Sequence, residues 1–259
     1  MSRASTSLVA DRPRTGLHLR RFFVAELSTQ DEFELPRALA HRVARVLRLK
    51  VADTFELVTQ RGSTHLVEIT RLTADRVFAR AVGDVSLVEP ADEDSVAIYQ
   101  CVPKGRKLDQ LVQDCTELGA TRVVAVFSER TVAHWEPTKT APRLRRLRAI
   151  AVHAAEQSRR PAPPVIDGPL SFAQAAERRP DRRQLVLAPG ASSRRLGAFV
   201  ATLTGPVDLL VGPEGGLSDA ESALVDANGW TAVSLGPRVV RTETAAVAAL
   251  AIILDRWEQ

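Results

Sequence analysis

Two loops near the carboxyl end of the chain hold residues that could bind a ligand. Residues 212–216 (GPEGG) follow the apolar run 207–211, and Gly236, Pro237 and Arg238 follow the apolar run 231–235. Short apolar runs of this kind are typical of strands buried in a parallel sheet. Loops after such strands bind ligands in open α/β sheets, and glycine lets the backbone approach a ligand and donate N–H groups to it. Both loops could equally be ordinary turns between a strand and a helix.

Neither of the two common glycine patterns for nucleotide binding occurs. No two glycines are separated by a single residue, so the dinucleotide pattern G-x-G-x-x-G is excluded, and G-x-x-x-x-G-K-[ST] is also missing. The ligand is therefore neither a dinucleotide bound in that way nor a nucleoside triphosphate in a P-loop.

The elements around these loops are predicted from local patterns. Ser218 stands three residues before Glu221, the spacing of a capping box, so a helix is expected to begin there and to end at Asn228 and Gly229. Thr242 or a neighbour is expected to cap a last helix, which is apolar nearly all round from residue 245 to 254. Such a helix is buried, either in the core or in a dimer interface.

These segments resemble the signature of a known family. LVGPEGGLS at 210–218 and LGPRVVRTETA at 235–245 are similar to the signature of the RsmE family, bacterial 16S ribosomal RNA (uracil-N3)-methyltransferases of the SPOUT superfamily. Weaker similarities occur at residues 20–23, 41–48, 104–107, 117–119, 128–132 and 156–160. Two extra residues separate His41 from the rest of its motif, and Arg159 stands where the family usually has glycine.

The resemblance implies a fold, a cofactor and partners. The fold would be a small N-terminal PUA-like β-barrel followed by a SPOUT α/β domain with a C-terminal trefoil knot. The cofactor would be S-adenosyl-L-methionine, and the protein would act as a homodimer on 16S rRNA or the small ribosomal subunit. Backbone and apolar contacts to the cofactor would come from Leu187, Ala188, Pro189, Val211, Gly212, Glu214, Gly215, Leu235, Gly236, Arg238, Val240, Thr242, Thr244 and Ala245.

Methyl transfer to N3 of uracil requires that the proton on this nitrogen be accepted or that the resulting anion be stabilised. Glu214 and Glu243 are candidate acceptors, and Arg241 or Arg238 could stabilise the anion. Arg21, from the barrel of the same or a partner chain, is a further candidate. Glu243 could instead be an acidic first-turn residue that favours its helix N-terminus. The sequence does not rank these candidates.

The chain divides into a flexible tail at 1–18, a first unit at 19–89 and a second unit at 95–259, with the acidic segment 89–94 (EPADED) as the hinge. In the first unit, strands are expected at 19–24, 54–59, 64–70 and 76–82, with a short basic helix at 36–46. Short strands with tight turns suggest a small barrel.

The second unit begins with a βαβ pattern. Strands are expected at 95–102 and 122–127, and apolar residues at helical spacing between them predict a helix that ends at Gly119. After a loop at 136–141, Pro142 is expected to open the next helix, because proline is favoured in the first turn. A further strand is expected at 184–187.

Arginine supplies nearly all of the positive charge, since only four of the 35 basic residues are lysine. Arginine binds phosphate in a bidentate manner and stacks on bases, so an RNA partner is plausible, although a GC-rich genome also enriches arginine. Arginines 42, 45 and 48 recur at helical spacing and are expected to form a positive stripe. The predicted RNA-binding residues are Arg20, Arg21, Arg42, Arg45, Arg48, Lys104, Arg106, Lys107, Arg130 and Arg160.

Other classes are disfavoured. No apolar run is long enough for a transmembrane helix, residues 1–17 lack the apolar segment of a signal peptide, and the histidines and the two cysteines lack the spacing of metal ligands. Cys115 is expected to be a buried thiol, and the protein to be cytoplasmic. Two alternatives remain: a SPOUT methyltransferase for another base or a 2′-OH, and a non-catalytic RNA-binding assembly factor.

Overall fold

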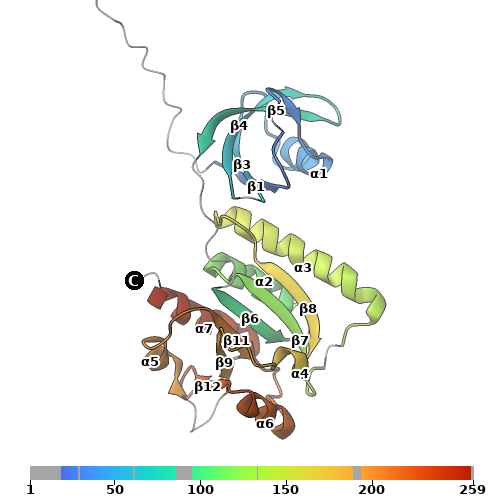
Figure 1. The fold of residues 1–259 in the computed structure, drawn as a ribbon. Coiled ribbons are helices and arrows are strands. Elements are labelled where there is room, and N and C mark those ends of the chain that lie inside the picture. Colours follow the sequence, from blue (N-terminus) through green and yellow to red (C-terminus); the bar gives the residue numbers. More distant parts are fainter. Residues whose placement is uncertain are drawn as a thin grey trace, which may run out of the picture.

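The computed structural model describes residues 19–28, 30–60, 62–85, 95–132, 134–188 and 194–257. They form two sheets, and Figure 1 shows the smaller sheet above the larger one. The predicted tail at 1–18 and the predicted hinge at 89–94 lie outside the described residues.

The smaller sheet is a half-barrel of five strands: β1 (Arg21–Val24), β2 (Phe33–Glu34), β3 (Thr54–Thr59), β4 (Thr64–Leu72) and β5 (Val77–Val85). Their order is β1-β3-β4-β5-β2; β1 runs parallel to β3, and the other pairs are antiparallel. The described residues show no pairing between the edge strands β1 and β2, so the predicted barrel is confirmed only as an open curved sheet. Its core contains Phe22 and Phe55, whose rings meet edge to face.

The predicted basic helix exists but is not regular. It consists of α1 (Arg37–His41) and η1 (Arg42–Val46), and η1 is a π-helix. Arg48 lies beyond the end of η1 with a positive φ of 54°. Arg48 therefore lies outside the helix, and the expected stripe of arginines 42, 45 and 48 at helical spacing is wrong for Arg48.

The larger sheet has seven parallel strands: β6 (Val96–Cys101), β7 (Arg122–Phe127), β8 (Val165–Ser171), β9 (Arg183–Leu187), β10 (Arg194–Arg195), β11 (Val207–Val211) and β12 (Thr231–Ser234). Their order is β10-β12-β9-β11-β6-β7-β8. The strands predicted at 95–102, 122–127, 184–187, 207–211 and 231–235 are confirmed to within a residue or two. All five residues of β11 are buried, as expected for a central parallel strand.

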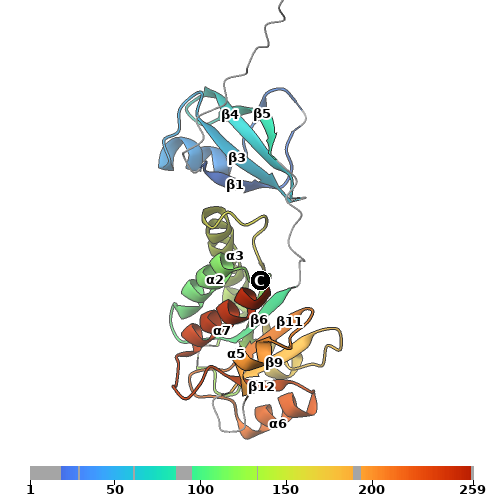
Figure 2. The ribbon, with the colours of Figure 1, turned by 90° about the vertical axis from the view of Figure 1, so that its left-hand side faces the viewer.

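Helices cover both faces of this sheet. One apolar cluster joins it to α2 (Lys107–Leu118), α3 (Pro137–Gln157), α5 (Leu196–Val200) and α7 (Thr242–Trp257), and the other joins it to α4 (Phe172–Ala175) and α6 (Asp219–Ala227). Strand β6 supplies Ile98 to the first cluster and Tyr99 to the second, the alternation expected of a strand covered on both faces. Figure 2 shows α7, α2 and α3 side by side on one face.

The last helix is buried on one side and half-exposed on the other. Ala246, Ala249, Leu250 and Ile253 are buried in the core, whereas Ile252 keeps 36% of its surface exposed. The core position expected of this apolar helix is therefore confirmed for one face. Among the described residues, no helix has the length and apolar character needed to cross a membrane.

One predicted helix start is wrong. Helix α3 begins at Pro137, with Glu136 as its N-cap, so Pro142 lies inside the helix rather than at its first turn. Proline has no N–H group, so the carbonyl of Thr138 lacks its intrahelical donor. Thr138 is exposed, and solvent can bond this carbonyl. Pro137 takes the favoured first position that the prediction gave to Pro142.

The half-barrel contacts the carboxyl end of α3, as Figure 1 shows. Glu56 of β3, only 4% exposed, accepts a hydrogen bond from Arg21 Nε at 2.8 Å and one from Arg159 at 2.7 Å. Glu156, at the end of α3, pairs with Arg42. Arg159 has a left-handed φ of 61°, the conformation that glycine adopts most easily.

Candidate functional site

Three loops meet at the carboxyl edge of the parallel sheet. They follow β9, β11 and β12, which are neighbours in the order β12-β9-β11. The sequence predicted these loops, and the strand order brings them together. Of the loop after β9, only Ala188 is described, so Pro189 lies outside the described residues.

Hydrogen bonds fix the loop after β11. Gly216 N–H donates to the carbonyl of Pro213 at 2.9 Å, which closes a turn, and Arg130 donates to the carbonyl of Gly215 at 3.0 Å. Thr242 Oγ1 donates to the carbonyl of Gly212 at 2.6 Å and accepts from Gln100 Nε2 at 2.9 Å. Thr242 thus joins this loop to the start of α7, of which it is the first residue rather than the predicted cap.

The loops keep backbone donors for a ligand. Within the described residues, the N–H groups of Gly215 and Gly236 carry no hydrogen bond. Gly236 has a φ of 120°, and a Cβ there would lie 3.2 Å from the guanidinium of Arg195. Both observations fit a cradle in which the backbone itself must contact the bound group.

The other predicted cofactor residues divide into two groups. Leu187, Val211, Leu235 and Val240 stand at or just beyond strand ends next to the loops, and Val211 is buried whereas the other three are half-buried. The backbone N–H groups of Ala188 and Ala245 are already bonded, to the carbonyls of Val233 and Arg241. Arg238 and Thr244 are exposed.

Two candidate acidic residues share one lysine. Lys107 Nζ lies 3.3 Å from Glu214 and 3.2 Å from Glu243. Burial alone would raise the pKa of the Glu214 carboxyl, but hydrogen bonds from the backbone N–H groups of Glu214 and Lys104 and from Lys107 outweigh it and lower this pKa. The hydrogen bonds to Glu243 and then Glu214 raise the pKa of Lys107.

Glu243 and Glu214 differ in the hydrogen bonds that their carboxylate oxygens accept. Glu243 Oε2 is buried and has no hydrogen-bond donor among the described residues. A buried carboxylate oxygen without a donor is unfavourable, so this atom is a candidate acceptor for a donor group of a ligand. Arg241, two residues earlier, is exposed at the same loop.

Comparison with known proteins identifies the family. Residues 90–254 match the model of the RNA methyltransferase domain. The chain is 34% identical over 228 residues to ribosomal RNA small subunit methyltransferase E of Synechocystis, covering 85% of this chain and 71% of the relative. The protein of the same name from Bacillus subtilis is 30% identical, covering 93% of this chain and 98% of the relative.

The chain belongs to the ribosomal RNA small subunit methyltransferase E family. A solved member from Neisseria gonorrhoeae, bound to S-adenosyl methionine, superposes with a TM-score of 0.81 at 28% identity and covers 92% of this chain and 98% of that chain. The RsmE resemblance of the sequence is thereby confirmed, together with its α/β class.

The predicted RNA-binding residues of this family member lie at opposite edges of the parallel sheet. Lys104, Arg106, Lys107 and Arg130 follow β6 and β7 and lie at the carboxyl edge with the cofactor loops. Arg20, Arg21, Arg42, Arg45 and Arg48 belong to the half-barrel, which contacts the segment just before the amino end of β8. Arg45 donates to the carbonyl of Ala74, and Arg20 and Arg48 are exposed.

Two of these arginines have internal roles. Arg160 donates to the carbonyls of Thr116, Gly119 and Ala120 at the end of α2, and burial lowers its pKa to about 10. Arg21 bonds Glu56 and the carbonyls of Arg159 and Arg160. Neither guanidinium is available to RNA in this arrangement, and Arg21 lies away from the cofactor loops of its own chain.

One site residue, Gln100, was missed by the sequence analysis, and two others, Lys107 and Arg130, were predicted only as RNA contacts. Lys107 joins the two candidate carboxylates. Gln100 and Arg130 fix Thr242 and Gly215. A polar glutamine at the end of an otherwise apolar strand was the one available signal for Gln100. The predicted burial of Cys115 is confirmed, Cys101 is also buried, and burial raises the pKa of each thiol to about 12.

Proposed function

We propose that this protein transfers the methyl group of S-adenosylmethionine to N3 of a uridine in 16S rRNA of the small ribosomal subunit, in the cytoplasm. The observation that supports this most directly is the cluster of three loops after β9, β11 and β12, with unbonded N–H groups at Gly215 and Gly236. The name of the family and the cofactor bound to the Neisseria gonorrhoeae member agree with this proposal.

The cofactor is bound mainly by backbone groups. We assign its polar contacts to Gly212, Gly215, Gly236 and the backbone at Thr244, and its apolar contacts to Leu187, Val211, Leu235 and Val240. The sulfonium of the bound cofactor supplies an activated methyl group. The protein's task is then to align the uracil nitrogen with it and to manage the proton on that nitrogen.

Glu243 is our candidate for the acceptor of the N3 proton. Its Oε2 atom lacks a donor, and a uracil N–H would supply one. Glu214 is less suited, because hydrogen bonds lower its pKa and its carboxylate already has several donors. We assign Arg241 to stabilisation of the uracil anion, since it is exposed beside Glu243.

A homodimer and a C-terminal trefoil knot complete the proposal. Helix α7 is apolar yet leaves Ile252 36% exposed, which suits a face covered by a second copy. Because the half-barrel lies at the amino edge of its own sheet, its arginines reach a cofactor site only if that site belongs to the partner. A contribution of the partner's half-barrel to RNA binding follows from the dimer.

The test is a methyl-transfer assay with labelled S-adenosylmethionine. The substrates are 30S subunits and naked 16S rRNA from a strain that lacks this gene, and mass spectrometry identifies the modified nucleoside. We expect 3-methyluridine on one of the two substrates. Cofactor binding without transfer to either would indicate a different RNA target, and absence of cofactor binding would leave only the RNA-binding assembly factor.

A further inference from the structure

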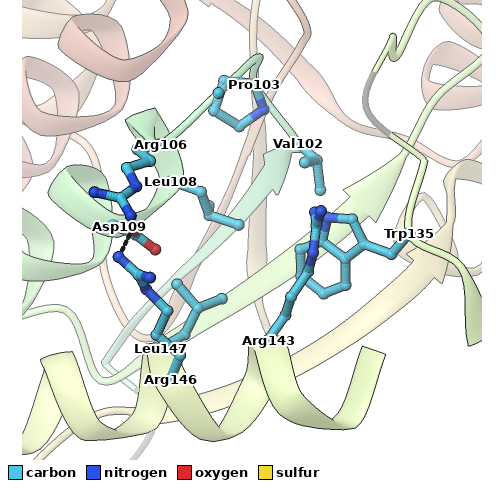
Figure 3. A pocket seen from close by; sticks show the side chains of 10 residues that line it. Val102, Pro103, Arg106, Leu108, Asp109, Trp135, Arg143, Arg146 and Leu147 are labelled. Carbon is cyan, nitrogen blue, oxygen red and sulfur yellow. Dashed lines mark hydrogen bonds and ion pairs between the residues drawn. The ribbon is translucent and has the colours of Figure 1, made fainter. Parts of the chain in front are cut away.

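A second pocket lies at the carboxyl edge of the sheet, outside the cofactor loops. It has a volume of about 200 Å³ and is enclosed by the segment after β6, the start of α2, Trp135 and the first half of α3. Figure 3 shows the ring of Trp135 and the Arg143 side chain on one side, with Arg146 and Asp109 on the other. Val102, Leu108 and Leu147 form apolar walls.

The pocket and the cofactor loops share one turn, residues 103–106. Pro103, Gly105 and Arg106 line the pocket, whereas Lys104 N–H and Lys107 Nζ both contact Glu214 of the cofactor loop. The turn therefore separates two neighbouring sites. A group bound in the pocket lies beside the cofactor site but not in it.

The pocket is positively charged. Three arginines, at 106, 143 and 146, line it together with one carboxylate, that of Asp109. Arg146 pairs with Asp109 at 2.7 Å. Among the described residues, Arg106 and Arg143 have no ion-pair partner. The Arg143 guanidinium carbon lies 5.4 Å from the centre of the Trp135 ring, within range of a cation–π contact.

Trp135 carries an unsatisfied donor. The residue is 8% exposed, and its Nε1 atom is buried without a hydrogen-bond acceptor among the described residues. Buried polar groups in folded proteins are nearly always paired, and an indole N–H can only donate. Because Trp135 lines the pocket, we take a ligand bound there as the candidate for the missing acceptor.

We propose that this pocket holds a single unpaired pyrimidine base of the RNA substrate, next to the nucleotide that is methylated. The inference rests on the proposed function. An engineered cavity of about 150 Å³ accommodates benzene, so a pocket of this size has room for one six-membered ring, which matches a pyrimidine better than the larger purine. Carbonyl oxygens of the base accept from Trp135 and the arginines, and the adjoining phosphate binds Arg106 or Arg143.

RNA is the ligand class that these groups fit best. Single-stranded RNA is recognised by bases that leave the stack, contact aromatic or guanidinium planes and present their polar edges to the protein. A nucleotide next to the target must lie close to the cofactor site, and the shared turn at residues 103–106 meets that requirement. Donors dominate the pocket, which favours uracil with its two carbonyl groups over cytosine.

The decisive variant is Trp135→Phe. The Trp135 ring packs edge to face on Phe127 at 5.8 Å, so phenylalanine keeps an aromatic ring in the core while it removes the N–H group together with the five-membered part of the indole. We expect the Kd of the full-length protein for 16S rRNA, measured without cofactor, to rise about twofold to tenfold, the effect of one hydrogen bond. The smaller ring should lower the thermal midpoint, as other large-to-small core substitutions do, whereas the Kd for S-adenosylmethionine should not change.

Arg143→Gln tests the charge, and Arg145→Gln is its control, since Arg145 is exposed on the same helix and does not line the pocket. Arg143→Gln should weaken RNA binding and lower the salt dependence of log Kd by about one. In the methylation assay both pocket variants should raise KM for RNA with little change in kcat. A large fall in kcat at unchanged KM would identify the pocket as the target-base site and overturn the flanking assignment.

Wild-type RNA affinity in Trp135→Phe and Arg143→Gln would overturn the pocket proposal outright. The wild-type enzyme separates this outcome from failure of the proposed function. If it forms 3-methyluridine while the variants bind RNA normally, only the pocket assignment is wrong. If it forms no product but the variants lose RNA affinity, the pocket stands and the reaction is misassigned.

Discussion

At the residue scale, the two acidic residues that the sequence could not rank have different surroundings. Both contact Lys107, but Glu214 also accepts backbone hydrogen bonds that lower its pKa. Glu243 keeps one buried oxygen without a donor among the described residues. This asymmetry supports the proposal that Glu243 accepts the proton and that Glu214 braces the loop.

Glu243→Gln should lower kcat by about a hundredfold or more, the usual effect of removing a general base. Glu214→Gln, the matched control, should lower kcat less and act mainly on cofactor affinity, because it loosens the loop. Single-turnover methylation and calorimetry with S-adenosylmethionine separate the two effects. Equal losses of kcat in both variants, at intact cofactor binding, would contradict the assignment.

The Lys107 cluster also predicts a pH range for loop stability. The pKa of Glu214 is lowered from 4.5, so its stabilising contribution is present above that value and is lost as the pH falls through the folded pKa. The pKa of Lys107 is raised from 10.5, so its contribution is complete below that value and is lost as the pH rises. Cofactor affinity, followed by calorimetry, should therefore decline at both extremes, and Lys107→Met should abolish the alkaline decline.

At the element scale, helix α6 shows how local sequence sets a boundary. The Ser218 side chain accepts from Glu221 N–H at 3.3 Å, and Glu221 Oε2 accepts from Ser218 N–H at 3.0 Å, so both bonds of the capping box form. Glu221 also accepts from Glu129 N–H at 2.8 Å, which ties the helix to the loop after β7. One sequence signal thereby fixes a helix start and a loop.

Ser218→Ala should lower the free energy of unfolding by about 1 kcal/mol, because the first turn of α6 loses a bonded acceptor. Ser222 is exposed inside the same helix. The variant Ser222→Ala should be neutral or slightly stabilising, since alanine is the better helix former. Chemical denaturation at equilibrium measures both. Equal stability of the two variants would mean that solvent replaces the cap.

The connection from α3 to β8 holds a residue in an unfavourable backbone conformation. Arg159 keeps a left-handed φ of 61°, and its guanidinium bonds Glu56 and the carbonyl of Leu19. The unfavourable backbone conformation is thus accompanied by contacts to the half-barrel that glycine could not make.

Arg159→Ala and Arg159→Gly separate these two effects. Both lose the contacts to Glu56 and Leu19, but only alanine keeps the penalty of the left-handed backbone. The free energy of unfolding of Arg159→Ala should therefore be lower than that of Arg159→Gly by about 1 kcal/mol, measured by thermal or chemical unfolding. Greater stability of the alanine variant would show that the backbone at this position carries no strain.

At the scale of the whole molecule, the half-barrel and the cofactor loops lie at different edges of the parallel sheet. The half-barrel is joined to the end of α3 by Arg21, Glu56, Arg159, Arg42 and Glu156. Its basic residues therefore cannot serve the cofactor loops of the same chain. A second copy would bring the two together, and the exposed face of α7 is the candidate contact.

Ile252→Asp should convert the dimer to a monomer, because a buried charge without a partner opposes association. We expect sedimentation to show the loss of the dimer and the methylation rate to fall with it. Val51→Asp, at a 53% exposed position of the half-barrel, is the control and should leave the mass unchanged. A monomeric wild-type protein, or an unchanged dimer in the Ile252 variant, would contradict this contact.

The sequence by itself determined the local elements and the family. Short apolar runs predicted five strands of the larger sheet, the capping box predicted α6, and the two glycine-containing motifs predicted the cofactor loops. These predictions succeed because each depends only on residues that are close together in the sequence. The start of α3 failed because two prolines compete for the favoured first position, and the local pattern does not decide between Pro137 and Pro142.

Only the tertiary structure decided how distant residues combine. Lys107 meets Glu214 and Glu243, Arg160 binds the end of α2, and Trp135 joins three arginines in a pocket. None of these contacts has a sequence signature, because each depends on strand order and helix packing rather than on spacing. The expected stripe of arginines 42, 45 and 48 fails at Arg48, because η1 ends at Val46. Arg42 pairs with Glu156 of α3, a contact that spacing in the sequence does not reveal.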